Sequence, residues 1–267
     1  MASFRVTTRG GWGRSGPLVE RFALALLLSA ISLSPADAQD PVRIFAAASL
    51  TDALSEAIKA FEAANPGVRV VPQFGASNDL ARQILAGAPA HLFFSADERQ
   101  MDRLEAEGAI ERGSRRDVLS NQLVIVEGAS GPARIRAPKD LEGIGKIALA
   151  DPEAVPAGVY ARRYLEALGL WQSLRGRVVP TLDVRAALAA VASGNVDAGF
   201  VYRTDALLEP RVRAAFEVPR AEGPRIVYPL ALLRGAGEAG KALHRYLASP
   251  AAGRLFDRYG FGRTEEK

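Results

Sequence analysis

Several residue types are scarce in this chain of 267 residues, and each scarcity argues against a class of protein. There is no cysteine, so the fold cannot depend on disulfides and the chain cannot carry the acylated cysteine of a lipoprotein. The only two histidines, His91 and His244, are far apart and have no metal-ligand spacing. Lysines and arginines are interspersed with acids and form no run, which gives little support to nucleic-acid binding.

Long apolar runs are also missing, apart from one near the N-terminus. Residues 22–33 form an apolar stretch that follows separated arginines and precedes Ala36-Asp37-Ala38, an A-x-A cleavage pattern. A membrane-spanning helix needs about 20 apolar residues, and no segment reaches that length. We therefore predict a signal peptide over residues 1–38, cleavage after Ala38 and a periplasmic protein without a membrane segment of its own. About half of the formal net charge of +4 lies in this leader.

Beyond the leader, strand-like apolar runs alternate with amphipathic helical runs, which predicts an α/β protein with mainly parallel sheets. The predicted strands are 42–47, 68–74, 92–94, 122–127, 146–150, 178–182, 198–202 and 225–233. The predicted helices are 50–64, 79–86, 98–107, 157–168, 184–192, 238–248 and 250–259. The strands at 122–127 and 225–233 are expected to cross between two lobes. We predict residues 39–122 as the first part of lobe 1, residues 123–225 as lobe 2 and residues 226–267 as the returning part of lobe 1.

Two strand-to-helix junctions in the first unit each place a serine where a helix starts. The segment RIFAAASLTDAL passes from strand to helix through Ser49, and FGASNDL does so through Ser77, with Gly75 allowing close backbone approach. A helix start leaves N–H groups without partners and carries a partial positive charge. In open α/β sheets, ligands sit at the carboxyl ends of strands, where both serines fall. The junctions therefore favour an anion site, while an ordinary N-cap role for each serine stays open.

Other polar residues favour structural roles. Asp97 and Asp151 each stand near a glutamate, but their contexts are typical of helix starts and turns, so we predict no acid/base catalysis there. Arg185 is expected to form a solvated or interlobe salt bridge rather than to clamp an anion. Structural or surface roles are expected for His91 and His244.

Seven short segments occur in order and at compatible spacings along essentially the whole mature chain. They are Phe45–Leu54, FGASNDLARQI, AGAPAHLFFSAD, DPEAVPAGVY, DVRAAL, GFVYRTDA and Arg258–Phe261. Together they resemble the molybdate-binding proteins of ABC transporters. The resemblance implies a two-lobed type II periplasmic-binding-protein fold, in which a tetrahedral oxyanion lies in the cleft between the lobes.

The resemblance also implies which residues hold the anion, using neutral hydrogen-bond donors only. Ser49 and Ser77 are expected to give hydroxyl and backbone donors, Ala157 and Val184 a backbone N–H each at a helix start, and Tyr202 its phenol. Molybdate at neutral pH is a fully deprotonated dianion, so donors alone satisfy its oxygens. We expect no cofactor and no direct metal ligand, because the molybdenum arrives inside the oxyanion.

The predicted function is therefore capture of molybdate, and of tungstate as well, by a monomeric non-enzyme that delivers the anion to an ABC permease. Two alternatives remain open. The ligand could be another tetrahedral oxyanion such as sulfate, because pocket radius decides between them. A secreted serine hydrolase is disfavoured, because no G-x-S-x-G segment is present and histidines are few. The chain departs from the family at His91, where Asp is usual, and at Gly75, Ala76 and Asn78, where serine is common.

Overall fold

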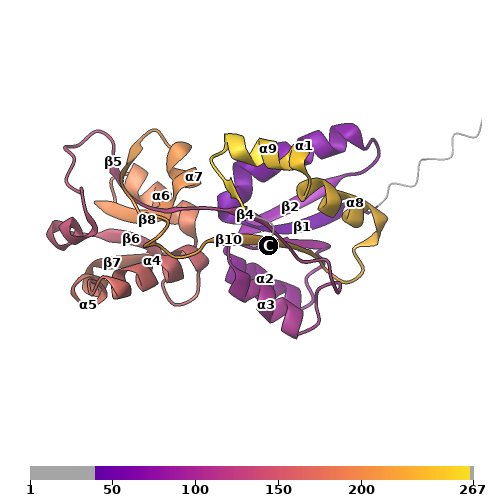
Figure 1. Ribbon diagram of the computed structural model, residues 1–267, viewed down its shortest axis with the longest axis horizontal. Helices are drawn as coiled ribbons and strands as arrows, with labels where there is room; N and C mark the ends of the chain where they lie inside the picture. Colours follow the sequence, from indigo (N-terminus) through magenta and orange to yellow (C-terminus); the bar gives the residue numbers. More distant parts are fainter. Residues whose placement is uncertain (1–39, 265–267) are drawn as a thin grey trace, which may run out of the picture. The chain divides into compact units, whose positions relative to one another are not determined.

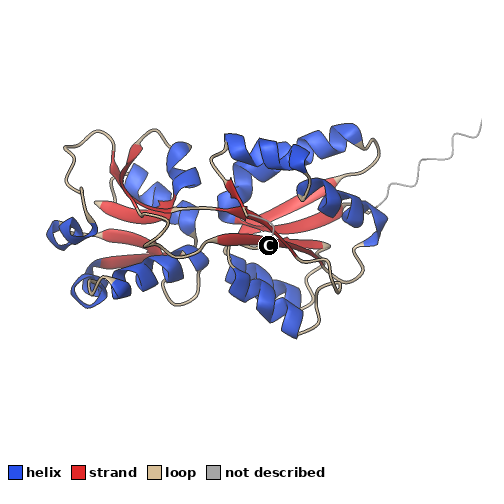
Figure 2. Ribbon diagram, viewed as in Figure 1, coloured by secondary structure: helices blue, strands red, loops and turns tan. Residues whose placement is uncertain are grey.

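The computed structural model describes residues 40–264, so the predicted signal peptide and its cleavage site lie outside the described residues. All described residues belong to one compact unit. They build two sheets, each flanked by helices, which confirms the predicted α/β class (Figures 1 and 2). Within residues 40–264, no helix is both long enough and apolar enough to cross a membrane.

The larger sheet has six strands in the order β11-β4-β10-β3-β1-β2. They are β1 (Val42–Ala47), β2 (Val70–Gly75), β3 (Leu92–Phe94), β4 (Arg116–Ser120), β10 (Val227–Leu232) and β11 (Gly262–Arg263). β1 pairs in parallel with β2 and β3, whereas the pairs β3–β10, β10–β4 and β4–β11 are antiparallel. Its helices are α1 (Thr51–Ala64), α2 (Ser77–Leu85), α3 (Glu98–Ala106), α8 (Gly237–Leu247) and α9 (Pro250–Arg258). We call this sheet with these helices lobe 1.

Helices on both faces explain why the central strands of lobe 1 are mostly apolar, with Arg43 near the start of β1 as an exception. Helices α1, α8 and α9 cover one face and α2 and α3 the other (Figure 1). Ile44 of β1 packs in the same cluster as Leu54 of α1, while its neighbour Phe45 packs with Leu80 of α2 and Met101 of α3. Successive side chains of one strand therefore enter different halves of the core.

The smaller sheet has five strands in the order β7-β6-β8-β5-β9. They are β5 (Leu123–Gly128), β6 (Ile147–Ala150), β7 (Val178–Thr181), β8 (Ala198–Tyr202) and β9 (Val212–Glu217). β6 pairs in parallel with β7 and β8, and β5 pairs antiparallel with β8 and β9. Its helices are α4 (Pro156–Ala167), α5 (Trp171–Leu174), α6 (Val184–Ala192) and α7 (Arg203–Leu207). We call this sheet with these helices lobe 2.

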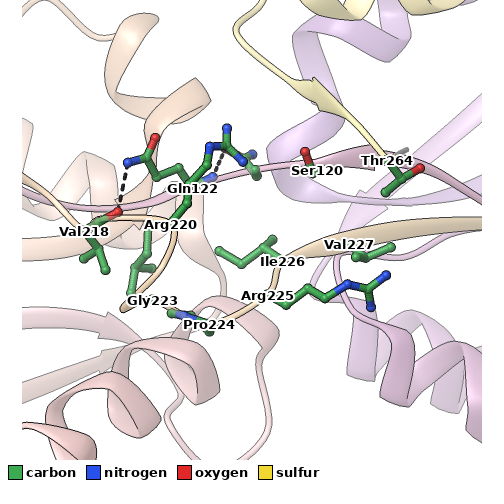
Figure 3. Close-up of a pocket in the computed structure, with 12 residues that line it drawn as sticks. Ser120, Gln122, Val218, Arg220, Gly223, Pro224, Arg225, Ile226, Val227 and Thr264 are labelled. Carbon is green, nitrogen blue, oxygen red and sulfur yellow. Dashed lines mark hydrogen bonds between the residues drawn. The ribbon is translucent and has the colours of Figure 1, made fainter. Parts of the chain in front are cut away.

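Two segments connect the lobes. Residues 121–122 lead from β4 to β5, and residues 218–226 lead from β9 back to β10. The amide of Asn121 donates to the carbonyl of Ile226 at 3.4 Å, and that of Val218 donates to Leu123 at 3.0 Å. A cavity of about 470 Å³ lies against both segments (Figure 3). The covalent connection between the lobes therefore consists of two segments of chain, which are held together by backbone hydrogen bonds.

The predicted helices and strands agree with the structure within a few residues, but the sheets are mixed rather than mainly parallel. In each lobe, three parallel strands carry the predicted strand-to-helix alternation. The chain must then pass between lobes, and the strands that do so, β4, β5, β9 and β10, run antiparallel to their neighbours. β4, β9 and β11 were not predicted, because they are partly exposed and lack an apolar run.

Candidate functional site: a pocket lined by helix starts

The five residues predicted to hold a ligand line one small pocket. Ser49 and Ser77 come from lobe 1, and Ala157, Val184 and Tyr202 come from lobe 2. The other lining residues are Ala47, Ala48, Gly75, Ala76, Ala96, Val155, Pro156 and Asp183. The cavity volume is about 20 Å³, against the roughly 300–1,000 Å³ of pockets for drug-sized molecules. The pocket lies between the lobes and suits a compact ion.

Four backbone N–H groups of the pocket stand at the first or second residue of a helix or 3₁₀ turn. Ser77 begins α2, Val184 begins α6, Ala157 is second in α4, and Ser49 is second in the 3₁₀ turn that precedes α1. N–H groups at these positions have no intrahelical acceptor. No other hydrogen bond from them is found within residues 40–264. Each helix start follows a parallel strand. The positive ends of two helix dipoles from each lobe therefore point toward the same pocket.

The serine hydroxyls are not N-caps, because neither α1 nor α2 has a side-chain cap and their capping residues are Leu50 and Ala76. The Ser77 hydroxyl instead accepts from the Ala96 amide at 3.0 Å. The Ser49 hydroxyl lies 2.9 Å from the hydroxyl of Tyr228. Both serines are buried. Of the two interpretations left open by the sequence, capping is therefore wrong for both.

Tyr202, at the end of β8, has a buried hydroxyl that finds no hydrogen-bond partner among the described residues. Burial raises the pKa of this phenol well above its usual range, so it stays protonated and can act as a donor. A buried polar group without a partner is costly, and such groups are rare in proteins. A ligand in the pocket would supply the missing acceptor.

The pocket offers no cationic side chain, since no lysine or arginine lines it. The one carboxylate in its lining, that of Asp183, accepts from the amide of Ala186 at 2.9 Å and so caps α6. The positive potential of the site therefore comes from helix starts and neutral hydroxyls. Such a site can hold an anion whose oxygens are all acceptors.

Comparisons with known proteins agree with this geometry. Residues 42–262 match the family described as bacterial extracellular solute-binding protein. The molybdate-binding protein ModA of Escherichia coli is 38% identical over 248 residues, which cover 90% of this chain and 96% of that protein. The chain belongs to this solute-binding family, alongside ModA.

Solved structures place the fold in the same group. The periplasmic molybdate-binding protein of Azotobacter vinelandii matches with a TM-score of 0.75 at 25% identity, covering 84% of this chain and all of that one. The sulfate-binding protein SubI of Mycobacterium tuberculosis matches with a TM-score of 0.72 at 21% identity, covering 84% of this chain and 87% of that one. The latter likeness shows the fold alone. The predicted two-lobed type II fold is confirmed.

In this solute-binding protein, Arg185 joins the two lobes beside the pocket. Its guanidinium Nη2 lies 2.8 Å from Asp52 Oδ2 in α1 and 3.4 Å from the carbonyl oxygen of Ser49. Its Nε lies 2.6 Å from Asp205 Oδ1 in α7. Burial raises the pKa of Asp205 to about 6, which still leaves the carboxylate ionised at neutral pH. The predicted interlobe salt bridge is confirmed, although its two carboxylate partners, Asp52 and Asp205, could not be identified from the sequence.

Neither histidine lies where a serine hydrolase would need one. His91 Nδ1 accepts from the Arg43 amide at 2.8 Å, at the start of β1, whereas Ser49 follows the end of that strand. A strand of six residues spans about 20 Å. His244 belongs to α8, and it does not line the pocket. No hydrogen bond between a serine hydroxyl and a histidine ring occurs in the part of the chain that the structure describes, nor does a group of three metal-ligating side chains.

Proposed function

We propose that this protein captures molybdate between its lobes and delivers it to the membrane permease of an ABC transporter. One observation carries the proposal: orphan N–H groups at four helix starts and three buried hydroxyls meet in an ion-sized pocket without a cation. The similarity to ModA supports the choice of anion. Tungstate, nearly the same size and charge, is the second ligand.

The donor set matches what a dianion needs and what a carrier must do. Each hydrogen bond to a charged group contributes about 1.5–3 kcal/mol, so several of them can replace the hydration shell of molybdate. No counter-charge is required, and the absence of a lysine or arginine clamp among the lining residues favours release. We further propose that the protein works as a monomer in the periplasm, after cleavage of its signal peptide at Ala38. In this role it needs no cofactor and catalyses no reaction.

Removing either serine hydroxyl should weaken molybdate binding without unfolding the protein. We expect Ser49→Ala and Ser77→Ala each to cost about 1–3 kcal/mol of binding free energy, because a buried anion oxygen loses a donor. Titration calorimetry measures the change. Ser193→Ala is the control, because its hydroxyl only donates to carbonyls within the exposed end of α6. A wild-type protein that takes up no molybdate would refute the proposed function, and unchanged affinity in both variants would remove the serines from the site.

Capture should involve closure of the lobes, and the bridge between Arg185 and Asp52 should favour the closed form. Asp52→Asn weakens this bridge but leaves the pairing of Arg185 with the buried Asp205 in place. Asp52 is 45% exposed in its side chain, so we expect a modest loss of about 0.2–1 kcal/mol, seen as faster molybdate dissociation. The control is Asp102→Asn, whose partner Arg115 lies in the same lobe. Equal dissociation rates in the two variants would show that the bridge does not act on closure.

A further inference from the structure

The hydroxyl of Ser49 belongs to a buried hydrogen-bonded chain that begins in the connection between the lobes. Tyr228, on β10, is fully buried, and its hydroxyl lies 2.9 Å from Ser49 Oγ and 3.2 Å from Asn121 Nδ2. Asn121 is buried as well and follows β4 directly. Neither Tyr228 nor Asn121 lines the ligand pocket. Their hydrogen bond to the pocket lining runs through Ser49, while the ring of Tyr228 also packs against that of Tyr202 with 5.9 Å between centroids, a contact that Tyr228→Phe keeps.

The hydrogen-bond partners fix the orientation of the Asn121 amide. Its Oδ1 accepts from the amide of Gln122 at 2.9 Å, so the NH₂ group must face the other way. That group donates to Thr204 Oγ1 at 3.0 Å and to the Tyr228 hydroxyl at 3.2 Å, which uses both of its protons. The Tyr228 oxygen therefore accepts a hydrogen bond from Asn121, so the Tyr228 O–H must donate to another atom.

Ser49 Oγ accepts the hydrogen bond that the Tyr228 hydroxyl donates. The Tyr228 hydroxyl has two hydrogen-bond partners within residues 40–264, and the other one, Asn121 Nδ2, is a donor. A fully buried hydroxyl without an acceptor would lose about 1–3 kcal/mol. The chain of donation thus runs from Asn121 to Tyr228 to Ser49 Oγ. The proton of Ser49 itself cannot point toward Tyr228 and is left for the pocket.

The Ser77 hydroxyl is also left to donate toward the pocket, because its Oγ accepts directly from the backbone amide of Ala96. We propose that Asn121 and Tyr228 are positioning residues that fix Ser49 as a donor toward the bound anion and so help to reject oxyanions that carry a proton. This inference rests on the proposed function. It assigns part of the selectivity to two residues outside the pocket.

The physical reason lies in the two ways a serine hydroxyl can face a ligand. A hydroxyl that is free to turn can present a lone pair and accept the O–H of a protonated anion such as hydrogen phosphate. With Tyr228 donating to it, Ser49 gains most by pointing its proton at the ligand. In Tyr228→Phe this constraint disappears. The Ser49 hydroxyl can then donate to a deprotonated oxygen of the anion or accept from a protonated one. The variant should therefore gain tolerance for phosphate.

Phosphate and sulfate are the probes, because they are similar in size and differ at neutral pH in whether they carry a proton. In competition with molybdate, we expect Tyr228→Phe to raise the affinity for phosphate relative to sulfate by roughly tenfold or more, the range set by one unpaired buried group. Molybdate affinity should fall by less than this. Tyr160→Phe is the matched control, because Tyr160 is also buried beside the site but its hydroxyl faces the carbonyl of Ala96 at 3.5 Å.

The outcomes separate this inference from the proposed function. Wild-type protein that fails to bind molybdate refutes the function itself. Wild-type binding with an unchanged phosphate-to-sulfate ratio in Tyr228→Phe overturns the inference, as does an equal rise in Tyr160→Phe, which would indicate a loosened pocket. Asn121→Ala, measured in parallel, should raise the same ratio because Tyr228 is then free to accept from Ser49. If Tyr228→Phe does not fold, Asn121→Ala tests the inference by itself. An unchanged phosphate-to-sulfate ratio in Asn121→Ala would show that the hydrogen bonds from Asn121 to Tyr228 to Ser49 do not orient the Ser49 hydroxyl.

Discussion

Molybdate and tungstate should bind this protein with about equal affinity, sulfate should bind far more weakly, and phosphate should not bind detectably. The first reason concerns protons. Phosphate near neutral pH carries at least one proton, and a pocket made of donors has no acceptor for it. Leaving one buried O–H unpaired costs about 1–3 kcal/mol, which is several-fold to more than a hundredfold in affinity. The hydroxyls of Ser49, Ser77 and Tyr202 are all expected to act as donors, so none of them would accept a hydrogen bond from the phosphate O–H.

The second reason concerns size, and it acts on sulfate. Sulfate is deprotonated like molybdate, but its S–O bonds are shorter than Mo–O bonds. The N–H donors at Ser49, Ser77, Ala157 and Val184 are held by helix starts on two different sheets, so they cannot all follow a smaller ion inward. Several hydrogen bonds would then stretch beyond good geometry together. Tungstate has nearly the radius of molybdate and meets both requirements.

Competition titrations of the four anions in one buffer test this order. Sulfate binding as tight as that of molybdate would overturn the choice of ligand and support the sulfate alternative. Tight phosphate binding would mean that a carboxylate in the pocket accepts a hydrogen bond from the O–H of the phosphate. Asp183 would then be the residue to examine, because it is the acid that lines the pocket.

The sequence was sufficient to predict those parts of the fold that depend on local pattern. β1, β3, β8 and α6 begin and end at the predicted residues, because each is an apolar or amphipathic run with a clear boundary. The missed strand β4 reads Arg-Asp-Val-Leu-Ser and is half exposed, so it lacks the apolar run of a central strand. Its position is determined by pairing with β10, more than a hundred residues later in the chain. Local patterns do not contain that information.

The candidate site divides in the same way. Ser49 and Ser77 could be singled out from strand-to-helix junctions, whereas Ala157 and Val184 have no side-chain chemistry and were identified by family resemblance. The structure brings all of them together with Tyr202, while binding of molybdate by these residues stays a prediction. Tyr228 was missed, because it contacts Ser49 across 179 positions of sequence and stands in no motif. Tertiary contacts of this kind become visible in the fold and not in the sequence.

Gly158→Ala should reduce both the stability of the protein and its affinity for molybdate. Gly158 follows Ala157 in the first turn of α4, where the helix meets the end of β6. A Cβ atom at this position would lie 1.8 Å from the carbonyl oxygen of Ala150 and 2.7 Å from that of Asp151. Both are backbone atoms, so no side chain can turn aside to make room. The start of α4 must move away from β6, and the Ala157 N–H moves with it.

We expect a destabilisation of about 3 kcal/mol, at the upper end of the cost of inserting a methyl group into a packed region. For a protein of this size, that corresponds to a fall in Tm of roughly 6–12 °C. Loss of the Ala157 donor should in addition weaken molybdate binding by about 1.5–3 kcal/mol, or at least tenfold. Thermal melting with and without molybdate, together with calorimetric titration of the same samples, measures both effects.

Gly176→Ala is the matched control, since nothing lies within 4 Å of its Cβ position and Gly176 is not among the glycines with positive φ. That variant should melt at or slightly above the wild-type temperature, because alanine restricts the unfolded chain. If Gly158→Ala melts like the control, then α4 does not press on the end of β6. If it is destabilised yet binds molybdate normally, the N–H of Ala157 is not a ligand donor, and the anion must be held by the other helix starts and the hydroxyls.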